Sequence, residues 1–143
     1  MAKLTVEVVT GERVVLSETD VDMVIAPGGD GALGILPHHA PLISTLAAGE
    51  LRVVKGSKEE SIIVFGGFIE VTPEKVIVLA DTAERIEEID VERAEAARHR
   101  AEEAVRQQGD TVEIEQALSA LRRANLRLSV GKRRRSTTGI GQS

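Results

Sequence analysis

The chain has 143 residues, of which 42% are hydrophobic, enough to bury the core of one ordinary domain with an appendage. It contains no cysteine, which excludes a disulfide framework, a thiolate metal site and a cysteine nucleophile. Its only aromatic residues are Phe65 and Phe68, so it lacks the rings on which single-stranded nucleic acids usually stack.

The charge pattern divides the chain into two parts. Residues 1–88 carry seven basic and fifteen acidic side chains (−8), and residues 89–143 carry eleven basic and eight acidic ones (+3). This asymmetry predicts an acidic unit followed by a basic unit. No apolar stretch approaches the ~20 residues of a membrane span, and no signal-peptide pattern is present. We therefore expect a soluble, cytoplasmic protein.

The first part of the chain is predicted to consist of β-strands. Short apolar or alternating segments recur there: LTVEVVT, RVVLSE, VDMVIAP, PLISTLAAG, ELRVVKG, SIIVFGG, FIEVTP and KVIVLADT. Turn residues such as Pro27 to Gly31 and Gly66-Gly67 separate them. Many short Val/Ile-rich strands at even spacing predict an antiparallel sandwich or barrel.

The second part is predicted to be helical. The pattern begins at Asp90, a good N-cap, and runs to about Gln108. A second helix follows from about Thr111 to Val130, where Gly131 is expected to end it. Two helices joined by so short a loop must form an antiparallel hairpin. We divide the chain into a β-sandwich domain at 1–84, a helical hairpin at 85–131 and a disordered basic tail at 132–143.

The apolar face of the first helix is small and shallow. Its stripe consists of Ala94, Ala97, Ala101 and Ala104, with Val105 beside them. The second helix presents a broader face: Ile114, Ala117, Leu118, Leu121, Ala124 and Leu128. At about 25 cal/mol per Å², such a hairpin is held by only a few kcal/mol of hydrophobic contact. We expect it to be able to open.

Four arginines of the helices raise the question of an anionic ligand. Arg93 occupies the first turn, where the helix dipole disfavours a cation, and Arg100 lies seven residues on, along the same edge of the alanine stripe. The two are either surface arginines paired with acidic neighbours or a guanidinium pair for a polyanion. Arg123 and Arg127 form a like-charge pair four residues apart, which periodicity places in solvent.

No catalytic constellation is found in the sequence. The glycine-rich segment PGGDGALGILPHHAPL lacks the Gly-Lys-Ser/Thr ending of a phosphate-binding P-loop and leads into another strand. His38 and His39 are adjacent, and on a strand they would point to opposite faces with no third zinc ligand nearby.

Several segments, taken together, resemble the epsilon subunit of F-type (bacterial, bacillus-like) ATP synthases. The segment GALGILPHHAPLI is similar to the signature loop of that family, and GGFIEVTPEKVIVLADTAER to the segment that closes its sandwich. IDVERA matches the motif that opens its helical hairpin, and LRRANLRLSV matches its second helix. The likeness extends in the right order from Leu4 to about Val130.

The resemblance implies a fold, a role and a location. The fold would be an antiparallel ten-stranded β-sandwich followed by an antiparallel two-helix hairpin. The role would be that of a noncatalytic central-stalk subunit bound to the gamma subunit and the membrane c-ring, helping to couple proton flux to rotation. The subunit would be peripheral, at the cytoplasmic face of the bacterial cell membrane. Asp30 and His39 match the region that contacts the c-ring and gamma.

The resemblance also implies that the helices act as a brake on ATP hydrolysis. Extended, they would enter the alpha/beta catalytic hexamer and meet an acidic segment of beta through Arg122, Arg123, Arg127, Lys132, Arg133, Arg134 and Arg135. Folded, the hairpin would bind ATP as a regulatory ligand, with magnesium left open. The ligand-binding residues carried over are Glu84, Ile89, Asp90, Arg93, Arg100, Arg123 and Arg127.

A second function remains open on the residues alone. A free-standing β-module with a basic helical arm would bind a polyanion such as RNA, although the shortage of aromatic residues argues against it. An enzyme is a third, more remote reading, because acid, base, metal and nucleophile sets are all missing.

Overall fold

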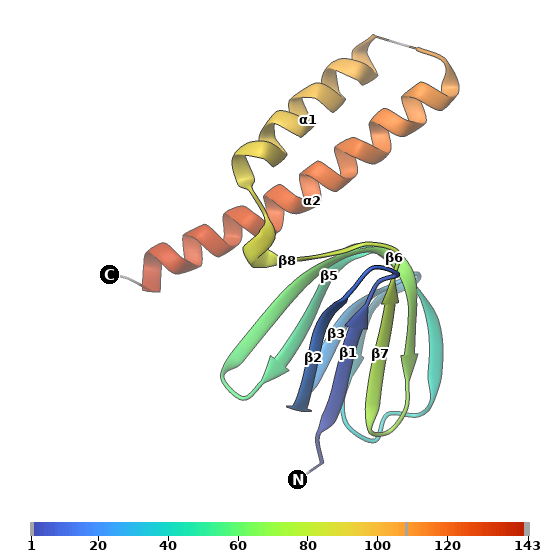
Figure 1. Cartoon of the computed structure of the whole chain (residues 1–143), viewed down its shortest axis with the longest axis vertical. Helices are drawn as coiled ribbons and strands as arrows, with labels where there is room; N and C mark the ends of the chain where they lie inside the picture. The colour runs from blue at the N-terminus through green and yellow to red at the C-terminus, as the bar shows by residue number, and fades with distance from the viewer. Residues whose placement is uncertain (1, 108, 142–143) are drawn as a thin grey trace. The chain divides into compact units, whose positions relative to one another are not determined.

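A computed structural model describes residues 2–107 and 109–141, with the backbone alone from residue 133 onward. The fold consists of two compact units, Met1–Arg85 and Ile86–Ser143 (Figure 1). The first contains the strands and the second the helices, and the division falls one residue after the predicted boundary at 84.

The strand unit is one extended sheet that closes around a core. Its strands are β1 (Leu4–Val9), β2 (Val14–Val21), β3 (Met23–Gly28), β4 (Gly31–Ile35), β5 (Leu42–Lys55), β6 (Lys58–Val71), β7 (Lys75–Ala80) and β8 (Ala83–Arg85). They are arranged in the order β2-β1-β7-β6-β5-β3-β4, with β8 paired to β6. The pairing is antiparallel except between β1 and β7, which are parallel, so the expectation of a purely antiparallel sheet is corrected.

The expected number of ten strands is also wrong for the described residues, which form eight. The reason is that β5 and β6 each run through two of the expected strand segments as one strand of 14 residues. In β6 the two segments meet at a bend at Gly66 and Gly67, whose φ angles are +83° and +121°. A Cβ at Gly67 would lie 2.1 Å from the backbone oxygen of Leu79, so only glycine fits there. Before the bend β6 pairs with β8, and after it with β7 (Figure 1). The sequence segments on either side of the glycines therefore belong to one continuous strand.

All strands bury side chains in a common core. In β1, residues alternate between buried and half-buried, and Leu4, Val6 and Val8 are fully buried. In β6, Ile62, Ile63 and Val64 are buried before the glycine bend, and Ile69 and Val71 are buried after it. All of these except Ile63 belong to the same hydrophobic cluster as the β1 residues. The core-facing positions therefore change parity at the bend, and the two halves of the long strand line the same core.

One surface carboxylate makes the stability of the strand unit depend on pH. Lys3 pairs with Asp22, and the Gly56 N–H donates to Asp22 Oδ2 at 2.7 Å. These two donors, the lysine first, hold the pKa of Asp22 below its usual value. Because the folded-state pKa of Asp22 is depressed, its carboxylate contributes fully to the free energy of unfolding above the unfolded-state pKa of about 3.9. This contribution is lost as the pH falls through the folded-state pKa.

We therefore expect Asp22→Asn to reduce the loss of stability in acid. The measurement is urea unfolding from neutral pH to below the folded-state pKa, with Glu74→Gln as the control for removing one exposed negative charge. An equal acid dependence in wild type and Asp22→Asn would contradict the assignment.

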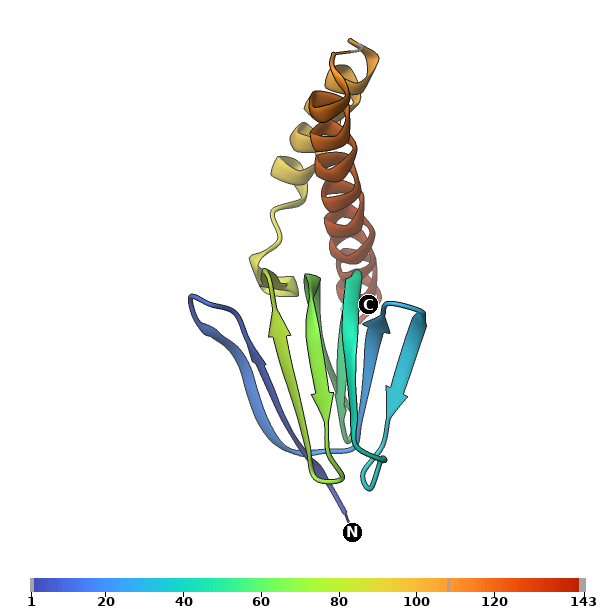
Figure 2. The same ribbon diagram turned by 90° about the vertical axis from the view of Figure 1, so that its right-hand side faces the viewer.

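The helical unit contains a short 3₁₀ turn, Ile86–Glu88, then α1 (Val91–Arg106) and α2 (Thr111–Gly141). Both α-helices begin at an aspartate cap. Asp90 Oδ1 accepts the Arg93 N–H at 3.1 Å, and Asp110 Oδ1 accepts the Glu113 N–H at 2.8 Å. The predicted cap at Asp90 is thus confirmed, and α1 lies alongside α2 in both side views (Figures 1 and 2).

Small residues line the contact between α1 and α2. Ala94 and Ala101 are buried on α1, and Ala117 and Ala124 on α2. The alanine stripe is partly as predicted, since Ala97 is half-buried and Ala104 is exposed. The spacing of seven residues in each helix keeps these alanines on one side, which allows close approach but removes little apolar area from water.

The predicted end of the second helix at Gly131 is wrong, because α2 continues to Gly141. Gly131 is buried within α2, and a Cβ there would lie 3.0 Å from Val91 Cγ2 and 3.2 Å from Ile89 Cγ2. The glycine is therefore a close-packing residue and not a helix stop. The sequence predicts a disordered tail at 132–143, and the structure describes the backbone of residues 132–141 as part of α2.

Candidate functional site

The start of α1 holds Asp90 and Arg93 together through the backbone. Asp90 has extended backbone angles (φ −94°, ψ 105°), and its carboxylate is engaged by the Arg93 N–H. The Arg93 side chain is exposed, so its guanidinium is not used in the cap. The cap thus fixes the first turn while leaving this cation at the surface.

The buried face of α1 differs from the predicted one. It contains Val91, Ala94 and Ala101, with Arg98 and Val105 half-buried on the same side. At about 100° per residue, Arg93 and Arg100 lie about 110° to 130° round the helix from the centre of this face. Both are exposed and do not border the packed face as predicted.

The two arginines of α2 have different environments. Arg123 is exposed, and its Nη1 donates to Ser119 Oγ at 2.7 Å. Arg127 is half-buried, three residues after the fully buried Ala124. The prediction that both lie in solvent therefore holds for Arg123 and not for Arg127.

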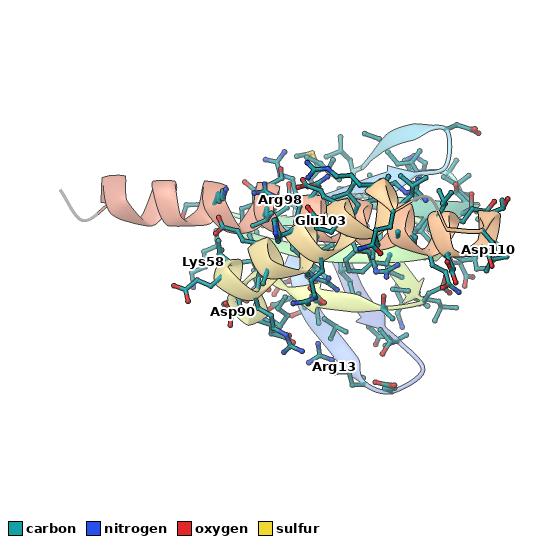
Figure 3. All side chains as sticks on the ribbon, turned by 90° about the horizontal axis from the view of Figure 1, so that it is seen from above. Arg13, Lys58, Asp90, Arg98, Glu103 and Asp110 are labelled. Carbon is teal, nitrogen blue, oxygen red and sulfur yellow. The ribbon has the colours of Figure 1, made fainter. Side chains whose placement is uncertain are left out.

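Two charged pairs in the hairpin were not found from the sequence. Arg98, on the packed side of α1, lies 3.8 Å from Glu102 (Arg98 is labelled in Figure 3). Lys132 of α2 pairs with Glu95 of α1 at 3.2 Å. The spacing of Arg98, seven residues from both Val91 and Val105, is a signal that could have placed it on the buried face. The Lys132–Glu95 pair depends on how the two helices are aligned along each other, which cannot be predicted from composition.

The remaining predicted ligand-binding residues belong to different units. Glu84 is half-buried in β8, opposite Ile63 of β6, in the strand unit. Ile89 is half-buried just before α1, next to the position of Gly131. The helical unit therefore brings six of the seven residues onto two adjacent helices and the segment before them. No group of metal-ligating side chains occurs among the described residues.

The structure describes the side chains of four residues predicted to contact the beta subunit, and one of them is the half-buried Arg127. Arg122 and Arg123 are exposed on α2, and Lys132 is exposed while paired with Glu95. Arg133, Arg134 and Arg135 lie outside the residues whose side chains are described.

Asp30 and His39 lie at opposite ends of one short strand. Asp30 is exposed in the turn before β4, and His39 is half-buried in the loop after it. His39 Nδ1 lies 2.7 Å from the Ala40 oxygen, and the neighbouring His38 N–H donates to the Pro73 oxygen at 2.8 Å. The two predicted contact residues thus do not form one cluster.

The strand unit also exposes an apolar patch that sequence reasoning missed. Ile43, Phe68 and Leu79 are 73%, 56% and 52% exposed, on β5, β6 and β7. Phe68 is directly opposite Leu79, and Ile43 is two residues from Thr45, the partner of Phe68 on β5. We call these three residues the β5–β7 patch. Alternation shows that one side of a strand is exposed, but only the sheet order shows that three large side chains share that side.

Within the described ranges, none of the helices combines the length and apolar character needed to cross a bilayer. Residues 3–86 match the β-sandwich domain of the ATP synthase delta/epsilon chain, and residues 87–132 match its long α-helix domain. These matches confirm the expected sandwich followed by two helices.

Two similar proteins, both named ATP synthase epsilon chain, match most of this chain. The ATP synthase epsilon chain of Dehalococcoides mccartyi is 50% identical over 136 residues, 94% of this chain and 96% of that protein. The epsilon chain of Herpetosiphon aurantiacus is 52% identical over 133 residues, 93% of this chain and 97% of that protein.

Solved structures agree with the sequence matches. A chain of the Euglena gracilis mitochondrial ATP synthase (OSCP/F1/c-ring) has a TM-score of 0.75 at 27% identity, covering 85% of this chain and 76% of that one. A chain of the Tetrahymena thermophila mitochondrial ATP synthase has a TM-score of 0.60 at 17% identity, covering 90% and 96%, and shows the fold alone. The chain therefore belongs to the ATP synthase delta/epsilon chain family, as its resemblance to epsilon subunits predicts.

Proposed function

We propose that this chain is a noncatalytic central-stalk subunit of a proton-translocating ATP synthase, in which the helical hairpin inhibits ATP hydrolysis and ATP holds the hairpin closed. The strand unit binds gamma and the c-ring, so the subunit is peripheral at the cytoplasmic face of the cell membrane. The single observation that carries the regulatory part is a hairpin packed largely through small residues that displays arginines at its surface.

The packing supports a hairpin that opens readily. The contact between the helices buries Ala94, Ala101, Ala117 and Ala124 where leucines would remove far more area from water. The hydrophobic cluster described in this unit consists of Val91, Ala94 and Leu128. A ligand needs to supply only about 1 to 3 kcal/mol of differential binding to shift such an equilibrium. Low ATP would then release the helices to act on the alpha/beta hexamer.

The charge distribution supports an anionic ligand. Arg93, Arg100 and Arg123 are exposed, and a guanidinium fork suits phosphate oxygens better than an ammonium. Asp90 fixes the first turn of α1 and so the position from which the Arg93 side chain extends. Family membership favours this reading over the free-standing polyanion-binding module.

The experiment is an isothermal titration of the full chain with ATP, with and without magnesium. We expect saturable binding and, by X-ray scattering, compaction. Arg93→Ala should weaken binding about tenfold or more, because a hydrogen bond to a charged group is lost. Asp90→Ala should weaken binding too and destabilise α1 by about 1 kcal/mol.

The matched control is Arg106→Ala, which removes an exposed arginine at the far end of α1, where it pairs with Glu103 at 2.9 Å (Glu103 is labelled in Figure 3). It should leave the affinity unchanged. Unchanged dimensions at millimolar ATP, or an equal loss in Arg106→Ala and Arg93→Ala, would contradict the proposed site.

A further inference from the structure

We propose that Gly131 determines how firmly α1 docks on α2, so that the residue at this one position sets the balance between closed and open hairpin. The inference rests on the proposed function only for its regulatory consequence. The docking role itself is a property of the helical unit.

The first observation is the lack of space at Gly131. Gly131 is buried, and a Cβ there would lie 3.0 Å from Val91 Cγ2 and 3.2 Å from Ile89 Cγ2. Both distances are shorter than ordinary van der Waals contact, so a Cβ at this position would require the side chains of Val91 and Ile89 to give way by a few tenths of an ångström. Val91 has little freedom to do so, because it is 5% exposed and clustered with Ala94 and Leu128.

The second observation is that the contacts around Gly131 converge on the same end of α1. Leu128 packs against Val91 and Ala94 one turn before the glycine, and Lys132 pairs with Glu95 at 3.2 Å directly after it. Three positions within five residues of α2 thus hold the first turn and a half of α1. A displacement at Gly131 would loosen the apolar contact and the ion pair together.

The third observation is that glycine is otherwise unfavourable at this place. Within a helix interior, glycine disfavours the helical state about fivefold relative to alanine. Gly131 nevertheless lies between Val130 and Lys132 inside α2. Its compensating advantage is close approach to α1, which an alanine would lose. Gly131→Ala therefore strengthens α2 alone while weakening its contact with α1.

The test uses the absence of native cysteine in the full chain. Spin labels are attached at Ala96→Cys on α1 and Asn125→Cys on α2, both exposed positions, and the interlabel distances are measured by double electron–electron resonance. We expect Gly131→Ala to lower the ratio of closed to open hairpin at least about fivefold, as overpacking of a buried contact does.

Two further variants separate close packing from helix propensity. Ser129→Ala also raises helix propensity in α2, but Ser129 is exposed, so the ratio should stay unchanged. In a Val91→Ala background, where the nearest methyl group is removed, Gly131→Ala should have a much smaller effect than in wild type. An effect of Gly131→Ala equal to that of Ser129→Ala, or undiminished by Val91→Ala, would overturn the inference.

A measurement in the assembled ATP synthase tests the regulatory consequence separately. If the open hairpin is the brake, Gly131→Ala should require more ATP to relieve inhibition of hydrolysis. A shift in the distance distribution without any change in ATPase activity would uphold the docking role and refute the proposed brake. An unchanged distribution of interlabel distances would refute the docking role of Gly131. The proposed brake would then be tested by removing every residue after Glu88.

Discussion

Removing every residue after Glu88 is expected to raise ATP hydrolysis by the assembled ATP synthase about fivefold or more at low ATP, the range of a typical regulatory coupling energy. The helical unit begins at Ile86, and the strand unit, Met1–Arg85, encloses its own hydrophobic core. The truncated chain should therefore still fold and assemble while lacking the proposed brake. The measurement is the initial rate of ATP hydrolysis by the purified complex.

A shorter truncation provides the matched comparison. Ending the chain after Lys132 removes the last part of α2 but keeps Gly131 and the Glu95–Lys132 pair. It should retain hairpin closure and relieve inhibition only in part, because the arginines after Lys132 are lost. A complex truncated after Glu88 that assembles normally and stays fully inhibited would place the brake elsewhere in the enzyme.

We expect the exposed, apolar β5–β7 patch to be the docking surface of the strand unit for gamma, because large exposed apolar patches mark interaction sites. Phe68→Asp should therefore weaken binding of the subunit to the rest of the central stalk about 30-fold or more, the size of effect seen at interface hot spots. Phe68 is 56% exposed in the centre of the β5–β7 patch, so the substitution removes an apolar contact and places a charge there. The fold should tolerate it because the side chain is outside the core cluster. The measurement is the affinity of the purified subunit for the gamma-containing subcomplex.

Val14→Asp is the control for introducing an aspartate at an exposed apolar residue. Val14 is 64% exposed at the start of β2 and is not part of the β5–β7 patch. Val14→Asp should leave the affinity for the gamma-containing subcomplex close to that of wild type. Both variants should unfold at similar urea concentrations. If Phe68→Asp binds as tightly as Val14→Asp, the patch is not the docking surface.

Local signals predicted much of the fold correctly. Alternating burial in β1 and the aspartate caps at Asp90 and Asp110 follow from interactions within a few residues, which the sequence displays directly. Gly131 shows the limit of such reasoning. A glycine near the end of an apolar pattern usually stops a helix, and its role here depends on Ile89 and Val91, which lie about 40 residues earlier in the chain.

The arrangement of the candidate site residues could be predicted only in part. The family motif singles out Asp90 and Arg93 as candidate ligand-binding residues, but the environments of Arg98 and Arg127 depend on which side of each helix is packed. Alanine stripes define that side poorly because small apolar residues also occur at exposed positions, as Ala104 does. The β5–β7 patch likewise required the order of strands that are not adjacent in sequence.

The bend at Gly66 and Gly67 has a mechanical consequence. Because β6 is continuous through it and pairs with β5 from Lys58 to Val71, the backbone itself joins the part of the sheet beside β8 to the part beside β7. A twisting load applied to one part is transmitted through covalent bonds and ladder hydrogen bonds as well as through side chains. We therefore expect the two parts of the sheet to move together under such a load.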